Sequence, residues 1–291
     1  MREIKNVVVV GAGTMGSGIA MVAAATGHEA TLVDVSQDIL DKSRAEIKKN
    51  ATRWSRKFYK DDPDAASAFV TEALGRISYS SQLDEVVQRA DLVIEAVVEN
   101  VKVKQELFKR LDDIAPHHVI FASNTSSLSI KELGSVTKRE DRFAGLHFFN
   151  PVPLMKLIEV IKTDRTSEDT HAALMAFGIS LGKTCITCKD SPGFIVNRLL
   201  FTFTAEALKM YERGDATPRD IDTAMKLGCG HPMGPFELMD MVGLDVTLSI
   251  MQERHKRSPE DPMAKPSAVL KKLVAEKKLG VKSGEGFYSY K

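Results

Sequence analysis

The chain has 291 residues, of which 43% are hydrophobic and 27% are charged. This composition is ordinary for a soluble globular protein, and the length favours one large domain followed by a smaller one. A net charge of +1 argues against a nucleic-acid partner, whose affinity would need many phosphate contacts, and the apolar runs are too short to form a membrane span.

The N-terminal segment predicts a β-α-β unit. Residues 7–10 are a β-branched run that favours a parallel strand buried on both faces. Residues 14–26 are small and apolar at helical spacing, and Gly27 supplies the stop. Residues 30–33 then predict a second buried strand.

A long amphipathic helix is predicted next, capped by Ser36 or Asp38 and running toward Lys60, with the Asp-Asp-Pro sequence at 61–63 ending it. Its expected apolar face consists of Ile39, Ile47, Trp54 and Phe58.

Strands are predicted at 77–80, 92–97 and 119–122, with a helix between the last two whose apolar face carries Val103, Leu107, Leu111 and Ile114. Further strands are expected at 143–148, 157–161 and 184–187, and a helix at 168–181.

This alternation predicts an α/β fold with a doubly wound, Rossmann-like and mainly parallel sheet. After residues 190–193 the strand pattern stops, and glycines and prolines divide the rest into helices. We therefore expect a dinucleotide-binding domain over residues 1–189 and an all-α domain over residues 190–291.

The three cysteines cannot all pair within the chain, so a reducing compartment is expected. Cys185 and Cys188 have the spacing of a redox pair, but both fall in a predicted strand. Because strand residues three apart point to opposite faces, we favour packing in the core for these two thiols.

A glycine-rich motif follows the first strand. Gly11, Gly13 and Gly16 fit G-x-G-x-x-G, in which the glycines permit a tight turn, a close approach of a pyrophosphate and close helix packing. Asp34 ends the next strand, about 20 residues on, where a carboxylate can bind both ribose hydroxyls. Its charge would repel the 2′-phosphate of NADP, so the motif predicts NAD as cofactor. The alternative is a glycine-rich turn with an ordinary strand-end Asp.

Three further blocks resemble the L-3-hydroxyacyl-CoA dehydrogenases: SNTSS at 123–127, GLHFFNPVP at 145–153 and DSPGFIVNR at 190–198. The likeness extends to 225–228, 231–235 and 282–288, and so covers essentially the whole chain. It is strongest to the short animal mitochondrial form, because 57–77 is longer than in bacterial 3-hydroxybutyryl-CoA dehydrogenases.

The resemblance implies NAD-dependent oxidation of an acyl-CoA substrate, L-3-hydroxyacyl-CoA, to 3-ketoacyl-CoA in fatty-acid β-oxidation. It also implies a homodimer formed through the C-terminal helical domain and a location in the mitochondrial matrix, with the cytoplasm as the alternative. No metal is expected.

Oxidation of a secondary alcohol requires a base, and histidine has a suitable pKa. His147 lies in a block of the resemblance at the end of a predicted strand, where parallel sheets bind ligands. Glu159 matches the family's partner carboxylate, which would fix the tautomer of His147. The alternatives are a hydrogen-bonded histidine within a packed strand and a surface-strand glutamate.

The resemblance assigns the remaining site residues. Ser126 would bind the reacting oxygen and Asn197 the substrate, although a turn-capping serine and a helix-capping asparagine are the alternatives. Lys57 would meet coenzyme A phosphates, while Asn50 stands where the family often has Ser. The implied cofactor contacts, besides the glycines and Asp34, are Thr14, Met15, Glu99, Lys104, Ser126, Asn150 and Lys282.

Two other functions are compatible with these patterns. The chain could be a non-catalytic NAD-binding structural protein, although His147, Glu159, Ser126 and Asn197 together argue against this. It could also be a 3-hydroxyacid dehydrogenase that does not require coenzyme A, which a comparison of acyl-CoA with the free acid would distinguish.

Overall fold

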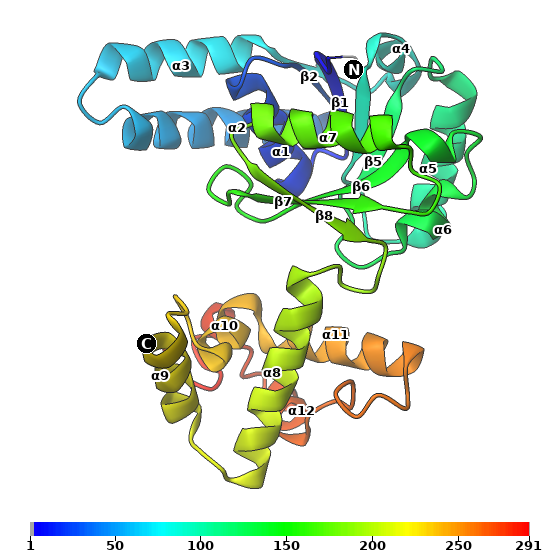
Figure 1. Ribbon diagram of the computed structural model, residues 1–291. Coiled ribbons are helices and arrows are strands. Elements are labelled where there is room, and N and C mark those ends of the chain that lie inside the picture. Colours follow the sequence, from blue (N-terminus) through cyan, green and yellow to red (C-terminus); the bar gives the residue numbers. More distant parts are fainter. Residues whose placement is uncertain (1–2, 291) are drawn as a thin grey trace. The chain divides into compact units, whose positions relative to one another are not determined.

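The computed structural model describes residues 3–290 and consists of two compact units, one ending at Ile195 and the other beginning at Val196 (Figure 1). The first unit contains an eight-stranded sheet with the order β3-β2-β1-β4-β5-β6-β7-β8. Its strands are β1 Asn6–Val10, β2 Glu29–Val33, β3 Ile77–Ser80, β4 Leu92–Glu95, β5 Ile120–Ser123, β6 Phe143–Phe148, β7 Leu157–Lys162 and β8 Thr184–Lys189. All neighbouring strands are parallel except β6 and β7.

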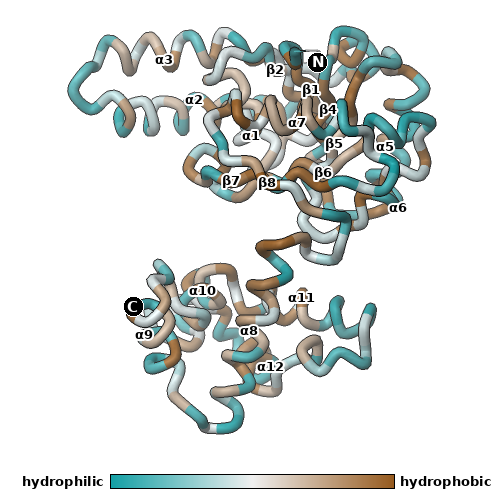
Figure 2. Tube along the Cα trace, in the orientation of Figure 1, coloured by the Kyte–Doolittle hydropathy of each residue, from teal (hydrophilic) through white to brown (hydrophobic). Residues whose placement is uncertain are grey.

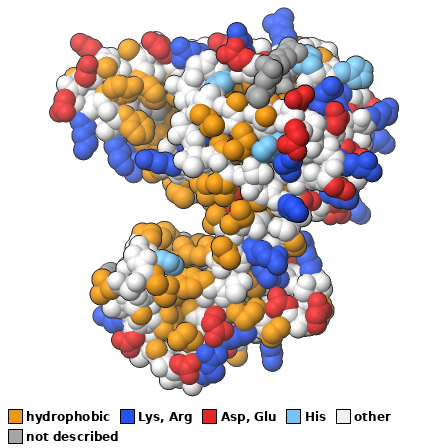
Figure 3. Space-filling view, in the orientation of Figure 1, with side chains coloured by type: hydrophobic (Ala, Val, Ile, Leu, Met, Phe, Trp, Pro, Cys, Tyr) orange, Lys and Arg blue, Asp and Glu red, His pale blue; other side chains and the backbone are white. Residues whose placement is uncertain are grey.

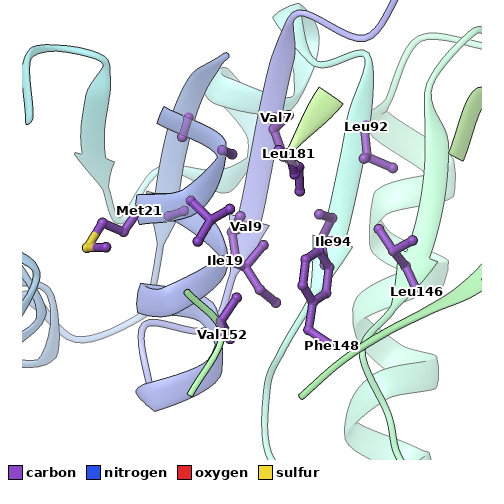
Figure 4. Close-up of a cluster of buried hydrophobic side chains, with 14 of the residues drawn as sticks. Val7, Val9, Ile19, Met21, Leu92, Ile94, Leu146, Phe148, Val152 and Leu181 are labelled. Atoms are coloured by element: carbon purple, nitrogen blue, oxygen red, sulfur yellow. The ribbon is translucent and has the colours of Figure 1, made fainter. Parts of the chain in front are cut away.

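Helices cover both faces of this sheet. Successive strand residues point to opposite sides, and because they are apolar, both sides must be buried. Val7 and Val9 belong to one buried cluster, which also includes Ile19, while Val8 and Val10 belong to a second. Figure 4 shows Val9 beside Ile19 in the first cluster. The helices of this unit are α1 Thr14–Ala25, α2 Gln37–Phe58, α3 Pro63–Gly75, α4 Leu83–Val86, α5 Val101–Ile114, α6 Ile130–Gly134 and α7 Glu168–Ser180. The predicted Rossmann-like class is confirmed.

Two predicted helix faces were only partly correct. In α2, Ile47 is buried and Trp54 packs against the core as predicted, but Ile39 and Phe58 are 41% and 56% exposed. The other buried residues of this helix are Leu40, Ser43, Ala51 and Ser55. In α5, Leu111 is buried and Leu107 and Ile114 pack against the core as predicted, but Val103 is exposed, and Lys104 and Phe108 are also buried. Small side chains and a buried lysine share these faces with the large apolar residues, so the large apolar residues alone did not define the faces completely.

The helix α3 was not predicted. Its N-terminus uses the residues that were expected only to end the preceding helix: the Asp62 carboxylate accepts a hydrogen bond from the Ala65 N–H at 2.9 Å, and Pro63 occupies the first turn. The helices α2 and α3 lie side by side (Figure 1). In Figure 2 the turn that joins them is hydrophilic, whereas β6 and β7 are largely hydrophobic.

The two strand cysteines point to opposite faces of β8, as predicted. Cys185 packs against the cluster that contains Val9, and Cys188 belongs to the cluster that contains Phe194. Burial, together with the nearby carboxylates of Glu159 and Asp190, raises the pKa of the Cys188 thiol to about 12. A thiol of this kind is a poor nucleophile, which is consistent with a packing role.

The second unit is helical. It contains α8 Val196–Arg213, α9 Pro218–Cys229, α10 Pro235–Val242, α11 Leu244–Arg257 and α12 Ala268–Ala275. Leu208, Phe236, Leu248 and Leu270 lie in its core. The buried Asp240 carboxylate accepts hydrogen bonds from the backbone N–H groups of Phe287 and Tyr288, both at 2.9 Å, and so fixes the C-terminal segment. Across residues 3–290, no helix combines the length and apolar character that crossing a membrane requires.

Candidate active site

The glycine loop joins β1 to α1 at the point where the strand order reverses. A Cβ atom on Gly11, whose φ is +105°, would lie 2.5 Å from the Ala96 carbonyl oxygen, and one on Gly16 would lie 1.8 Å from the Gly11 carbonyl oxygen. A Cβ atom on Gly13 would meet nothing within 4 Å. Gly11 and Gly16 are therefore required by the fold, whereas Gly13 leaves the backbone open to a ligand.

The carboxylate of Asp34 is fixed beside this loop. Its Oδ2 atom accepts a hydrogen bond from the Ala12 N–H at 2.9 Å, and its Oδ1 atom accepts one from the Ser36 N–H at 3.2 Å. The carboxyl end of β2 thus places a negative charge next to the open backbone, as a ribose-binding site requires.

His147 and Glu159 lie opposite each other in the antiparallel pair of β6 and β7, so their side chains share one face of the sheet. The His147 Nδ1 atom is 2.7 Å from Glu159 Oε2, and the Glu159 side chain is fully buried. Its Oε1 atom accepts a hydrogen bond from the Ile195 N–H at 3.1 Å. A carboxylate can only accept, so Nδ1 carries the proton and Nε2 of the neutral ring holds the lone pair.

Aromatic rings surround this imidazole. The ring centroids of Phe149 and Phe194 lie 4.5 Å and 5.6 Å from that of His147, which is itself 4% exposed. Packing therefore restricts rotation of the ring, and the carboxylate of Glu159 fixes which nitrogen is protonated.

The loop after β5 carries three neighbouring hydroxyl groups that differ in their hydrogen bonds. Thr125 Oγ1 and Ser127 Oγ both donate to the Glu99 carboxylate, the latter at 2.9 Å, whereas the exposed Ser126 between them forms no hydrogen bond among residues 3–290. Asn124 Oδ1 accepts a hydrogen bond from the Phe148 N–H at 2.9 Å, which ties this loop to the end of β6. The chemistry of the sequence did not distinguish Ser126 from Ser127, but the structure gives Ser127 a partner within the protein.

Glu95, at the end of β4, is a site residue that the sequence analysis missed. It is fully buried, and its Oε1 atom lies 2.5 Å from the ammonium nitrogen of Lys104, which is 1% exposed. The same ammonium lies 3.1 Å from Glu99 Oε2. A carboxylate ending an otherwise apolar buried strand was the available signal, since an unpaired buried charge is costly.

The carboxyl group of Glu99 is kept ionised by its neighbours. Burial acts to raise its pKa, but hydrogen bonds from Thr125 and Ser127 and the charge of Lys104 together lower the pKa below its usual value. Glu99 and Lys104, which the resemblance assigned to cofactor binding, therefore belong to one charged cluster with Glu95.

The other predicted residues lie on separate elements. Thr14 and Met15 are in the first turn of α1, and Asn150 is exposed just after β6. Asn197 is in the first turn of α8 and Lys282 is near the C-terminus, both in the second unit. The Lys282 ammonium pairs with Asp245 at 2.5 Å.

The two residues proposed for coenzyme A lie on α2. Asn50 Nδ2 donates to Glu46 Oε1 at 3.2 Å, so its amide is engaged within the helix. Lys57 is exposed and forms no ion pair among residues 3–290. Figure 3 shows Lys and Arg side chains along the edge of the first unit where α2 lies.

A doubly wound sheet with an open glycine loop and a His–Glu pair at its ligand-binding edge defines a nicotinamide-dependent dehydrogenase. The family model for the 3-hydroxyacyl-CoA dehydrogenase NAD binding domain matches residues 6–191, and that for the C-terminal domain of the same enzymes matches residues 193–290. The chain belongs to the 3-hydroxyacyl-CoA dehydrogenase family.

Individual relatives agree with this assignment. The chain is 56% identical to the mitochondrial hydroxyacyl-coenzyme A dehydrogenase of Rattus norvegicus over 99% of this chain and 92% of that protein. It is 45% identical to a probable 3-hydroxybutyryl-CoA dehydrogenase of Bacillus subtilis, over 99% of this chain and 98% of the relative. The crystal structure of (S)-3-hydroxybutyryl-CoA dehydrogenase from Ralstonia eutropha superposes with a TM-score of 0.91 at 43% identity, covering 99% and 100% of the two chains.

A matched pair of glycine substitutions tests the loop. Gly13 has an extended backbone, with φ −71° and ψ −171°, and space for a Cβ atom. Gly13→Ala is therefore expected to change the free energy of unfolding by less than about 0.5 kcal/mol but to weaken NAD⁺ binding at least about tenfold. Gly16→Ala forces the backbone of Gly11 to move and should cost about 1–3 kcal/mol. Urea unfolding and calorimetric titration measure both effects; unchanged NAD⁺ affinity in Gly13→Ala would contradict the proposed approach to the loop.

Proposed function

We propose that this protein oxidises the 3-hydroxyl group of an L-3-hydroxyacyl-CoA to a ketone in fatty-acid β-oxidation. This proposal is carried by the 2.7 Å contact between His147 Nδ1 and Glu159 Oε2. The contact lies on the side of the sheet where the parallel strands have their carboxyl ends, as does the open glycine loop. This arrangement provides a base of defined tautomer beside a dinucleotide site, which is what the oxidation of an alcohol requires.

In the proposed mechanism, the lone pair of His147 Nε2 takes the proton from the substrate hydroxyl. Bound NAD⁺ supplies the acceptor for the hydride that leaves C3 of the substrate. As His147 becomes an imidazolium, the Glu159 carboxylate stabilises its positive charge through Nδ1–H. The exposed hydroxyl of Ser126 donates a hydrogen bond to the reacting oxygen.

The other assignments are part of the same proposal. Residues 1–189 form the NAD-binding domain, and residues 190–291 bind substrate, through Asn197, and mediate a homodimer. The exposed position of Lys57 supports a contact with coenzyme A phosphates, whereas the internal hydrogen bond of Asn50 weakens its case. We place the protein in the mitochondrial matrix; a mitochondrial location is supported by the names of the mammalian relatives.

The test is NADH formation with NAD⁺ and either (S)-3-hydroxybutyryl-CoA or free 3-hydroxybutyrate. We expect kcat/KM for the thioester to exceed that for the free acid by at least about a hundredfold, because binding energy from the coenzyme contributes to the rate. Equal values would favour a 3-hydroxyacid dehydrogenase that does not require coenzyme A. NAD⁺ binding without turnover of either compound would favour a non-catalytic structural protein.

A further inference from the structure

The charged cluster formed by Glu95, Lys104 and Glu99 lies at the carboxyl ends of β4 and β5. Glu95 Oε1 lies 2.5 Å and Glu99 Oε2 lies 3.1 Å from the Lys104 ammonium nitrogen. Glu95 also accepts hydrogen bonds from the Val97 N–H at 2.7 Å and from the Ser123 hydroxyl at 2.6 Å. Two carboxylates share one ammonium, so the cluster carries one net negative charge.

The strand order places this charge at the nicotinamide half of the dinucleotide site. In a doubly wound sheet the two mononucleotide halves lie on either side of the position where the strand order reverses, here between β1 and β4. Asp34 at the end of β2 marks the ribose of the adenosine half. The ends of β4 and β5 therefore face the nicotinamide half, next to His147 on β6.

The nicotinamide ring is positively charged in NAD⁺ and neutral in NADH, and a fixed negative charge distinguishes the two states. The cluster is mostly buried: Glu95 and Lys104 are 0% and 1% exposed, and only the Glu99 side chain, 40% exposed, meets solvent. Solvent therefore screens the charge on Glu95 much less than a surface charge.

We propose that the Glu95–Lys104–Glu99 cluster sets the preference of the site for oxidised over reduced cofactor. Glu95 is the buried carboxylate that gives the cluster its excess of negative charge. This inference rests on the proposed function, because it requires a nicotinamide at the ends of β4 and β5. A role limited to holding the fold would affect the binding of both cofactor forms equally.

The experiment measures the equilibrium dissociation constants of NAD⁺ and NADH by calorimetry, without acyl-CoA, in the wild type and in Glu95→Gln. A unit charge changes the affinity for a cation about 12 Å away by about tenfold at an effective dielectric constant of about 20. We therefore expect the ratio Kd(NAD⁺)/Kd(NADH) to rise about tenfold in Glu95→Gln. Glu99→Gln, measured in parallel, removes the same charge from the exposed end and should raise the ratio in the same direction even if Glu95→Gln does not fold.

Asp91→Asn is the matched control. Asp91 is a buried carboxylate at the opposite end of β4, where its Oδ2 atom accepts a hydrogen bond from the Asn6 N–H at 2.9 Å. Its replacement also removes a buried charge but should leave the ratio unchanged. Equal weakening of NAD⁺ and NADH, or no change, in both glutamate variants would overturn this inference alone. Failure of the wild type to bind either nucleotide would overturn the proposed function and this inference together.

Discussion

Replacing His147 with Gln is expected to lower kcat about a thousandfold while leaving the dissociation constant of NAD⁺ nearly unchanged. The Gln amide can still donate a hydrogen bond to Glu159 and fill much of the space between Phe149 and Phe194, but it cannot accept the substrate proton. The loss should therefore fall on the chemical step rather than on folding or cofactor binding.

Stopped-flow measurement of NADH formation at saturating L-3-hydroxyacyl-CoA tests this expectation. His171→Gln is the matched control, because His171 is a partly exposed histidine of the same unit whose Nε2 atom contacts Thr187 Oγ1 at 2.8 Å on the surface. The control should retain wild-type kcat. A His147→Gln enzyme with more than about a tenth of wild-type kcat would show that another group takes the proton.

Replacing Glu159 with Gln is expected to lower kcat about a hundredfold or more with little change in the KM for acyl-CoA. The amide oxygen can still accept from His147 Nδ1–H, but the negative charge that stabilises the imidazolium is lost. If that oxygen faces His147, the amide NH₂ faces the Ile195 N–H, and two donors then meet. A buried donor left without an acceptor should reduce the free energy of unfolding by about 1–3 kcal/mol.

Steady-state kinetics and urea unfolding separate these two effects. Glu168→Gln removes the charge of an 84% exposed glutamate that pairs with Lys162, and it should leave both quantities nearly unchanged. If Glu159→Gln raised KM and left kcat intact, Glu159 would contribute to substrate binding and not to the proton transfer.

The positions of the strands were largely predictable, because buried parallel strands leave β-branched runs such as 7–10 in the sequence. The glycine loop followed from residue spacing alone. The His147–Glu159 contact was not visible in periodicity, since residues 12 apart meet only when β6 and β7 pair antiparallel in the observed register. That antiparallel pairing departs from the otherwise parallel sheet and was not predicted; the family resemblance indicated only that Glu159 is the partner of His147.

Other features required the three-dimensional structure because their sequence signals conflict with simple patterns. Lys104 lies on the buried face of α5, where hydrophobic periodicity favours an apolar residue, and it is stabilised there by the carboxylates of Glu95 and Glu99, which precede the helix. Glu95, which ends an otherwise apolar strand, was missed because its partner Lys104 lies on a different element. The buried stripe of α2 contains Ser43, Ala51 and Ser55, whose small size lets α2 approach its neighbours without a strong apolar signal.

The most direct test of the account is the protonation state of the His147 ring nitrogens, measured by nitrogen-15 NMR of histidine-labelled protein, with His147→Gln used to assign the signal. We predict that the neutral ring carries its proton on Nδ1, toward Glu159, and that Nε2 is unprotonated. A proton on Nε2 in the neutral ring would contradict it, because that nitrogen could then not accept a proton from the substrate alcohol.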